Sequence, residues 1–369
     1  MLGGTHDFVT DGEQSASVLA DALCEYGFPL VTAAPQTDGH GWAVRAADPG
    51  PYPDDREGYR WFEAVGRDAA AVGRRYGAYP AGSSQRAAGD LPDVGRGASI
   101  RREAPGARPP LPALILAPAP PSAVLADAPA PPAEPARLDG LDAVPWATLQ
   151  HAFGSAADVP GLLADLAADP SRWPEISDDL VGDKVLHQGT CYSATAPALG
   201  FLAALYPALN PPDRGGLLRT LLFAACQWTE SVLGDADRAA AEHRPPEASR
   251  WTAEVRDAVL ATVPALLARW EGEPPAIRYR LSALAGLCVP AGRRIAASID
   301  EFAAEHEGTR QGEYLSLAAA LVLDPESAPV IASGIASWDD TIELHWVDAP
   351  GVAPLLVARQ VLAAGVAEV

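Results

Sequence analysis

The densest group of polar and aromatic side chains spans residues 187–192, His-Gln-Gly-Thr-Cys-Tyr. Such side chains can anchor a bound partner through hydrogen bonds, with His187 and Tyr192 as the main anchors. The simpler interpretation is a helix start, in which Thr190 caps the helix and His187 ties a neighbouring loop through a ring nitrogen. If the segment binds a partner, the candidate residues are His187, Gln188, Thr190 and Tyr192.

The sequence contains none of the common catalytic motifs, neither a glycine-rich nucleotide loop nor a zinc-protease or serine-hydrolase signature. Cys191 follows His187 by four residues, a spacing that seldom gives a catalytic dyad, and the sequence places no third group beside them. Asp339 and Asp340 are adjacent, so their carboxylates point to different faces and favour a loop with a capping aspartate over an acid–base pair. We therefore expect no enzymatic activity, metal or cofactor.

Charge and cysteine content restrict the partner and the compartment. The 369 residues contain 27 Lys and Arg against 48 Asp and Glu, a formal net charge of −21. This acidity disfavours nucleic acid, whose binding requires clustered basic residues, and favours a basic protein as the partner. The alternative interpretation is that the negative charge only aids solubility. The four cysteines are widely spaced, which is typical of buried free thiols in a reducing compartment. Since no long apolar run and no secretory signal is evident, we expect a cytoplasmic protein without a membrane helix.

Composition divides the chain into three regions. Residues 1–91 mix strand and helix patterns, residues 92–137 are rich in proline and alanine, and residues 138–369 have helical periodicity almost throughout. Proline removes a backbone donor and disfavours helix at the preceding residue, so the middle region is predicted to be an extended linker. Within it, the apolar residues 114–116 can dock as a short strand or anchor, although a solvated linker with an incidental apolar triplet is the simpler interpretation.

The first region has the order strand, helix, strand, strand, helix, strand, which is the ferredoxin-like pattern. Helix starts are recognised by capping residues and helix ends by glycine. The predicted starts are Asp11 or Gly12 and Asp54 or Asp55, the predicted ends are Gly27 and Gly77, and the predicted strands are 6–10, 28–33, 41–46 and a weak edge strand around 78–80.

Two segments of this region resemble the RraB family of ribonuclease E inhibitors. They are residues 27–33, GFPLVTA, and residues 74–82, RRYGAYPAG. The second segment lacks a glycine and a later tryptophan of the family's pattern. The resemblance covers about 80 residues and implies an α+β fold and, by analogy, inhibition of a ribonuclease.

The third region contains a recurring string, in which a small residue or valine is followed by proline and apolar residues. The copies at Pro197, Pro264 and Pro329 are 67 and 65 residues apart. Each gap is about twice 33, a period typical of two-helix repeats that stack into an α-solenoid. Further copies are found at Pro160 and Pro354, with degenerate ones near Leu221 and Ile295.

The start of the third region resembles bacterial HEAT-repeat proteins, which carry a similar HQGT-x-Y-x-ATAPA string. The matching residues here are 187–190, Tyr192 and 194–198. The resemblance implies an α-solenoid with a protein-binding role, and it implies no catalytic site.

Together these patterns predict a ferredoxin-like α+β domain at residues 1–91, a Pro/Ala-rich linker at 92–137 and an acidic HEAT-like α-solenoid at 138–369. The predicted function is a non-enzymatic interaction module that binds a basic protein, for example as the inhibitor or immunity factor of a nuclease or toxin. A DNA glycosylase on a HEAT scaffold is the enzyme alternative. It is disfavoured because residues 138–369 contain 15 Arg and Lys against 31 Asp and Glu. A structural scaffold within a larger assembly is the third alternative.

Overall fold

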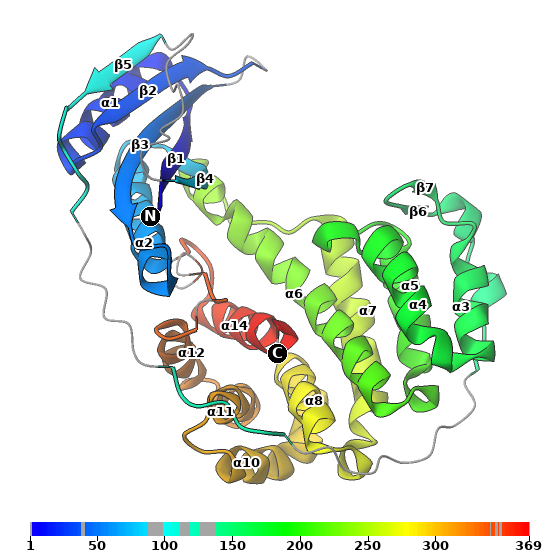
Figure 1. The fold of residues 1–369 in the computed structure, drawn as a ribbon. Helices are drawn as coiled ribbons and strands as arrows, with labels where there is room; N and C mark the ends of the chain where they lie inside the picture. The colour runs from blue at the N-terminus through cyan, green and yellow to red at the C-terminus, as the bar shows by residue number, and fades with distance from the viewer. Residues whose placement is uncertain are drawn as a thin grey trace. The chain divides into compact units, whose positions relative to one another are not determined.

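The computed structural model describes residues 2–37, 41–87, 99–110, 119–125, 137–339, 341–343, 346 and 349–368. The chain divides into two compact units, a sheet unit and a helical unit (Figure 1). In the described ranges, no helix combines the length and the apolar character needed to cross a membrane. The sheet unit consists of Met1–Ala117, Leu233–Glu247 and Glu343–Val352, and the helical unit of Pro118–Val232, Ala248–Ile342 and Ala353–Val369.

The sheet unit is built on five strands in the order β4-β1-β3-β2-β5. Every neighbouring pair is antiparallel. Strands β1 and β3 pair at the centre, with Phe8 opposite Val44, and both side chains are buried. The strands are β1 Leu2–Thr10, β2 Leu30–Pro35, β3 Trp42–Tyr52, β4 Tyr79–Ala87 and β5 Ile100–Glu103.

Helices α1 (Glu13–Tyr26) and α2 (Arg56–Arg75) contact each other and the sheet, and their apolar side chains form the core of this unit. The carboxylate of Asp55 accepts a hydrogen bond from the Gly58 amide at 2.9 Å, which caps the start of α2 as predicted. Gly27 has a φ of 127°, which favours glycine, and it ends α1 as predicted.

Strand β5 lies within the stretch that the sequence predicts as linker. It pairs with β2, with Ile100 opposite Ala33, and Ile100 is buried. Residues 99–103 contain no proline, so their backbone groups are free to join the sheet edge. The apolar residues 114–116, predicted as a docking anchor, lie outside the described residues.

The second unit is largely helical, as predicted, but it begins with a two-stranded hairpin of β6 (Gln150–His151) and β7 (Gly154–Ser155). Short 3-10 turns join several helices, and η4 (Asp178–Val185) is a π-helix. The α-helices are α3 Val159–Ala168, α4 Trp173–Ser177, α5 Thr195–Ala204, α6 Pro211–Ala241, α7 Arg250–Leu267, α8 Pro275–Leu287, α9 Val289–Gly292, α10 Ala296–Glu305, α11 Arg310–Leu323, α12 Ala328–Ala336 and α14 Pro354–Glu368.

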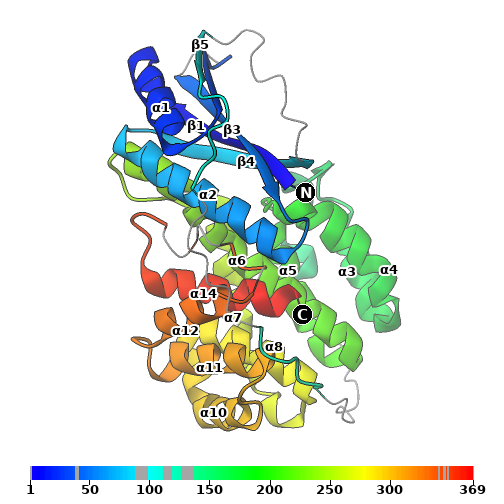
Figure 2. The ribbon, with the colours of Figure 1, turned by 60° about the vertical axis from the view of Figure 1, so that its left-hand side comes forward.

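Helices that follow one another in the chain pack together in much of this unit, including α7 with α8, α10 with α11 and α11 with α12. The last helix departs from this order. Helix α14 contacts α8, α11 and α12, and Figure 2 shows it beside α11 and α12. A strict solenoid restricts each repeat to contacts with its neighbours, so α14 adds long-range packing to the stack.

The prolines of the recurring string do not all lie at the same position within their helices. Pro160, Pro197, Pro329 and Pro354 lie in the first turns of α3, α5, α12 and α14, as a repeat predicts. Pro264 instead lies near the end of α7, so the predicted phase is wrong at this copy.

A proline inside a helix cannot donate to the carbonyl four residues earlier. For Pro264 that acceptor is the carbonyl of Leu260, and the thiol of Cys288 donates to it at 3.8 Å. The degenerate copy at Leu221 lies within the single 31-residue helix α6, where two repeat helices were expected.

Candidate functional site

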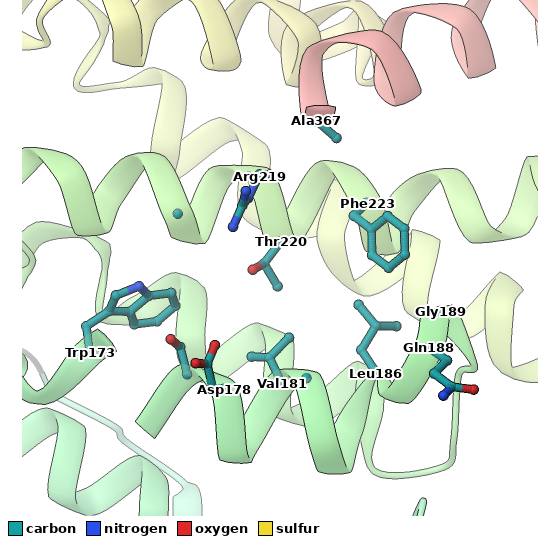
Figure 3. A pocket seen from close by; sticks show the side chains of 13 residues that line it. Trp173, Asp178, Val181, Leu186, Gln188, Gly189, Arg219, Thr220, Phe223 and Ala367 are labelled. Carbon is teal, nitrogen blue, oxygen red and sulfur yellow. The ribbon is translucent and has the colours of Figure 1, made fainter. Parts of the chain in front are cut away.

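The helical unit contains a surface groove of about 390 Å³ between the π-helix η4 and helix α6. Figure 3 shows Arg219 and Thr220 directed from α6 toward Asp178 and Val181 on the opposite wall. The lining residues are Trp173, Ser177, Asp178, Val181, Gly182, Leu186, Gln188, Gly189, Gly216, Arg219, Thr220, Phe223 and Ala367.

The wall that faces α6 has an uncommon backbone. The eight residues of η4 form a π-helix, a conformation that is rare and frequently found at functional sites. Directly after it, Gln188 adopts φ 50° and ψ 37°, and Gly189 adopts a φ of 77°. A left-handed conformation costs a residue with a side chain about 1–2 kcal/mol. The fold therefore holds Gln188 against the groove at an energetic cost.

Trp173 forms one end of the groove and depends on a glycine opposite it. Its side chain is buried, and a Cβ atom at Gly216 of α6 would lie 3.2 Å from the indole Nε1. Glycine at position 216 thus allows α6 to approach the indole closely. Figure 3 shows the ring at the same end of the groove as Asp178.

Charge around the groove is predominantly negative. Residues 158–189 contain seven Asp and Glu against two basic residues, Arg172 and Lys184. Arg172 pairs with Asp165 and Glu175, and Lys184 pairs with Asp158 and Asp179. Within the part of the chain that the structure describes, the exposed Asp178 and Asp183 form no ion pair.

The structure separates the four predicted site residues. Gln188 lines the groove, and His187 lies beside it with its Nδ1 3.3 Å from the carbonyl of Gly182. The predicted partner of this ring nitrogen was a neighbouring loop, whereas Gly182 belongs to the π-helix η4. Thr190 and Tyr192 are absent from the groove lining.

Thr190 does not cap a helix, so that part of the prediction is wrong. Helix α5 begins five residues later, at Thr195, and Thr190 is exposed. The hydroxyl of Thr195 accepts the Tyr192 amide at 2.8 Å and donates to the carbonyl of Val185. Thr195 therefore makes the tie between helix start and loop that the sequence assigned to its neighbours.

Two aromatic residues near the groove are absent from the sequence-based site. Phe153, at the tip of the β6–β7 hairpin, is 71% exposed, and its ring centroid lies 5.6 Å from that of His187. Phe223 of α6 is 37% exposed and lines the groove. The sequence signal for Phe153 is an aromatic residue followed by glycine in a short turn, which is easily read as core.

The hairpin that carries Phe153 is fixed by polar contacts. The buried ring of His151 accepts the Phe153 amide at Nδ1, at 3.0 Å. Its Nε2 lies 3.1 Å from the carboxylate of Asp158, which also lies 3.8 Å from the ammonium of Lys184. The Ala152 amide donates to the Lys184 carbonyl at 3.0 Å. These contacts hold the hairpin that carries the exposed ring of Phe153.

The sequence analysis considered Cys191, Asp339 and Asp340 for catalysis, and the structure describes the first two. Burial raises the pKa of Cys191 to about 12, so its thiol is protonated at neutral pH. Asp339 is buried and accepts hydrogen bonds from Tyr314 at 2.5 Å and from Arg310 at 2.6 Å. Asp340 lies outside the described residues. Among the described residues, no group of three or more His, Cys, Asp or Glu side chains is placed to hold a metal ion.

Comparison of the chain with protein-family models, curated proteins and solved structures gives no match. The groove therefore has to be interpreted through its own chemistry. It offers aromatic and aliphatic surface, uncompensated carboxylates and one guanidinium, and the nearby Cys191 thiol is protonated.

Proposed function

We propose that this protein is a non-enzymatic interaction module whose helical unit binds a basic partner protein. The binding surface is the aromatic face, defined as Phe153, His187, Gln188 and Phe223. The observation that carries the proposal is the 71% exposure of Phe153 on a hairpin in which both ring nitrogens of His151 have hydrogen-bond partners. Exposed aromatic side chains on rigid supports are typical energetic centres of protein interfaces.

Charge supports a basic partner. Asp178 and Asp183 are exposed near the aromatic face, and the two basic residues of this segment are already paired with carboxylates. A partner surface rich in Arg or Lys would supply the missing positive charge and associate faster through electrostatic steering. A nuclease or toxin that the chain inhibits would present such a surface.

The architecture is consistent with this role. We assign the sheet unit to the ferredoxin-like class, supported by the order β4-β1-β3-β2 and the two helices that pack on the sheet. We assign the helical unit to a short HEAT-like stack, supported by the packing of consecutive helices. In the analogy with ribonuclease inhibitors, the sheet unit would contribute a second contact to the same partner, which raises avidity.

Photo-crosslinking tests the aromatic face. The full chain would carry p-benzoylphenylalanine in place of Phe153 or, as a matched control, in place of Val330, an exposed apolar residue of α12 that is 74% exposed. We expect one predominant adduct with a basic protein at position 153 and none with that protein at position 330.

The captured protein is then purified and its affinity measured by calorimetry. Phe153→Ala and Phe223→Ala should each weaken binding by about tenfold or more, and Val330→Ala should leave it unchanged. Equal labelling from both positions, an acidic adduct, or binding that is insensitive to both phenylalanine substitutions would overturn the proposal.

A further inference from the structure

A short proline-containing segment of the middle region lies against helix α11 within the helical unit. It comprises residues 119–125, Ala-Pro-Pro-Ser-Ala-Val-Leu, which we call the strap (Figure 1). The carbonyl of Pro121 accepts the Arg310 amide at 3.0 Å, and the Ala123 amide donates to Oε1 of Gln311 at 2.7 Å. The strap is thus held through its backbone at two points.

The receiving surface already has the groups that an extended chain needs. The first amides of a helix lack acceptors within the helix, and the strap carbonyl satisfies the amide of Arg310 at the first position of α11. With the strap in place Gln311 is only 5% exposed, and its carboxamide oxygen accepts the Ala123 amide. Thr309 caps the same turn by accepting the Gly312 amide at 3.0 Å.

Arg310, whose backbone amide contacts the strap, is also held through its side chain. The guanidinium of Arg310 donates to Asp339 at 2.6 Å and lies 5.5 Å from the ring centroid of Trp338. Tyr314 donates to the same carboxylate at 2.5 Å. These contacts link the first turns of α11 to Trp338 and Asp339 and do not involve the strap.

We infer that the N-terminal end of α11 is a binding site for extended, proline-containing peptides, occupied in the same molecule by residues 119–125. Proline favours the extended conformation before binding and therefore reduces the entropy lost when a peptide docks. The ligand must offer a free carbonyl at one residue and a free amide two residues later, as Pro121 and Ala123 do. Val124 is 94% exposed, so this side chain is not read by the site.

Hydrogen–deuterium exchange of the full chain tests occupancy. In the wild-type protein, the Arg310 amide should exchange at least about tenfold more slowly than an unstructured amide. Ala123→Pro removes the strap donor without altering the helical surface and should abolish this protection, whereas Val124→Ala should preserve it. Gln311→Leu should act as Ala123→Pro does. Rapid exchange of Arg310 in the wild type, or protection that survives Ala123→Pro, would overturn the inference.

A second experiment tests recognition of a separate peptide. The Ala123→Pro chain, whose own strap is disabled, is titrated with a synthetic peptide of residues 117–127, APAPPSAVLAD. We expect saturable binding by calorimetry and restored protection of Arg310. The same peptide with proline at the position of Ala123 should not bind. Absence of binding by the unmodified peptide at millimolar concentration would show that the site does not recognise peptides of this class.

Discussion

The guanidinium of Arg214 lies 3.2 Å from both carboxylate oxygens of Glu273, and both side chains are buried. Arg214 belongs to the first turn of α6, and Glu273 follows the 3-10 turn after α7. The same guanidinium donates to the carbonyls of Tyr206 and Pro207 at 3.2 Å. One charged pair thus ties the chain before α6 to the chain after α7.

This pair leads to a prediction about stability. Glu273→Ala leaves the buried guanidinium of Arg214 without its counter-charge, and breaking a buried pair on one side costs about 3–5 kcal/mol. Urea unfolding should show this loss. Glu271→Ala, at an exposed position two residues away, should change stability by less than about 0.5 kcal/mol. Similar effects of the two substitutions would contradict the assigned role.

Asp235 predicts a dependence of stability on pH. It is buried and accepts hydrogen bonds from Arg244, Arg238 and the Glu247 amide, and chiefly the Arg244 contact holds its pKa well below the usual range. An unfolded aspartate titrates near pH 3.9. The stabilisation is therefore complete above about pH 4 to 5 and is lost as the pH falls toward the folded value.

Asp235→Asn should accordingly be less stable than the wild type at pH 7, and the difference should shrink below about pH 4. Urea unfolding at several pH values measures it. Asp300→Asn, at an exposed position of α10, serves as the control and should show a small difference that does not vary with pH. A constant deficit for Asp235→Asn would count against the linkage.

Because Gln188 has a positive φ, its replacement by glycine distinguishes a structural role of this residue from a binding role. Gln188→Gly should raise stability by up to about 1 kcal/mol or leave it unchanged, because glycine adopts positive φ without penalty. Partner capture through position 153 should nevertheless fall, because the carboxamide is removed from the aromatic face. His243 is the other described non-glycine residue with a positive φ, and His243→Gly should leave capture of the partner unchanged. Loss of stability in Gln188→Gly would refute this interpretation of its conformation.

Burial predicts the order in which the cysteines react. Desolvation raises the pKa of Cys191 and of Cys226 to about 12, so both thiols stay protonated at pH 8. Cys24 and Cys288 are partly exposed. Mass spectrometry after brief labelling with a maleimide should find the latter two modified first, and all four in denaturant. Early labelling of Cys191 would contradict its burial.

The elements of the sheet unit were largely predictable because their signals are local. Asp55 and Gly27 mark helix ends through their own side chain or conformation, and alternation marks the strands. Strand β5 was missed because its pairing with β2 depends on a distant edge, and the surrounding prolines dominate the local composition. The domain boundaries at residues 91 and 137 remain predictions.

The helical unit was predictable in class but not in detail. A valine–proline string begins α3 at Pro160, yet the same string lies inside α7 at Pro264, where Cys288 supplies a substitute donor from outside the helix. The groove depends on a π-helix and on the left-handed Gln188, which tertiary contacts select. The sequence could not show that Phe153 is exposed, because phenylalanine is found both in cores and on surfaces.

Lys184 has a practical consequence. It is the only lysine of the sequence, and it lies at the end of the π-helix, paired with Asp179 and Asp158. Lys184 is therefore the only side chain of this sequence that an amine-reactive fluorophore marks, which places a chromophore beside the groove without any engineered residue. A lysine-specific protease likewise has one cleavage position in the chain, between the hairpin and α5.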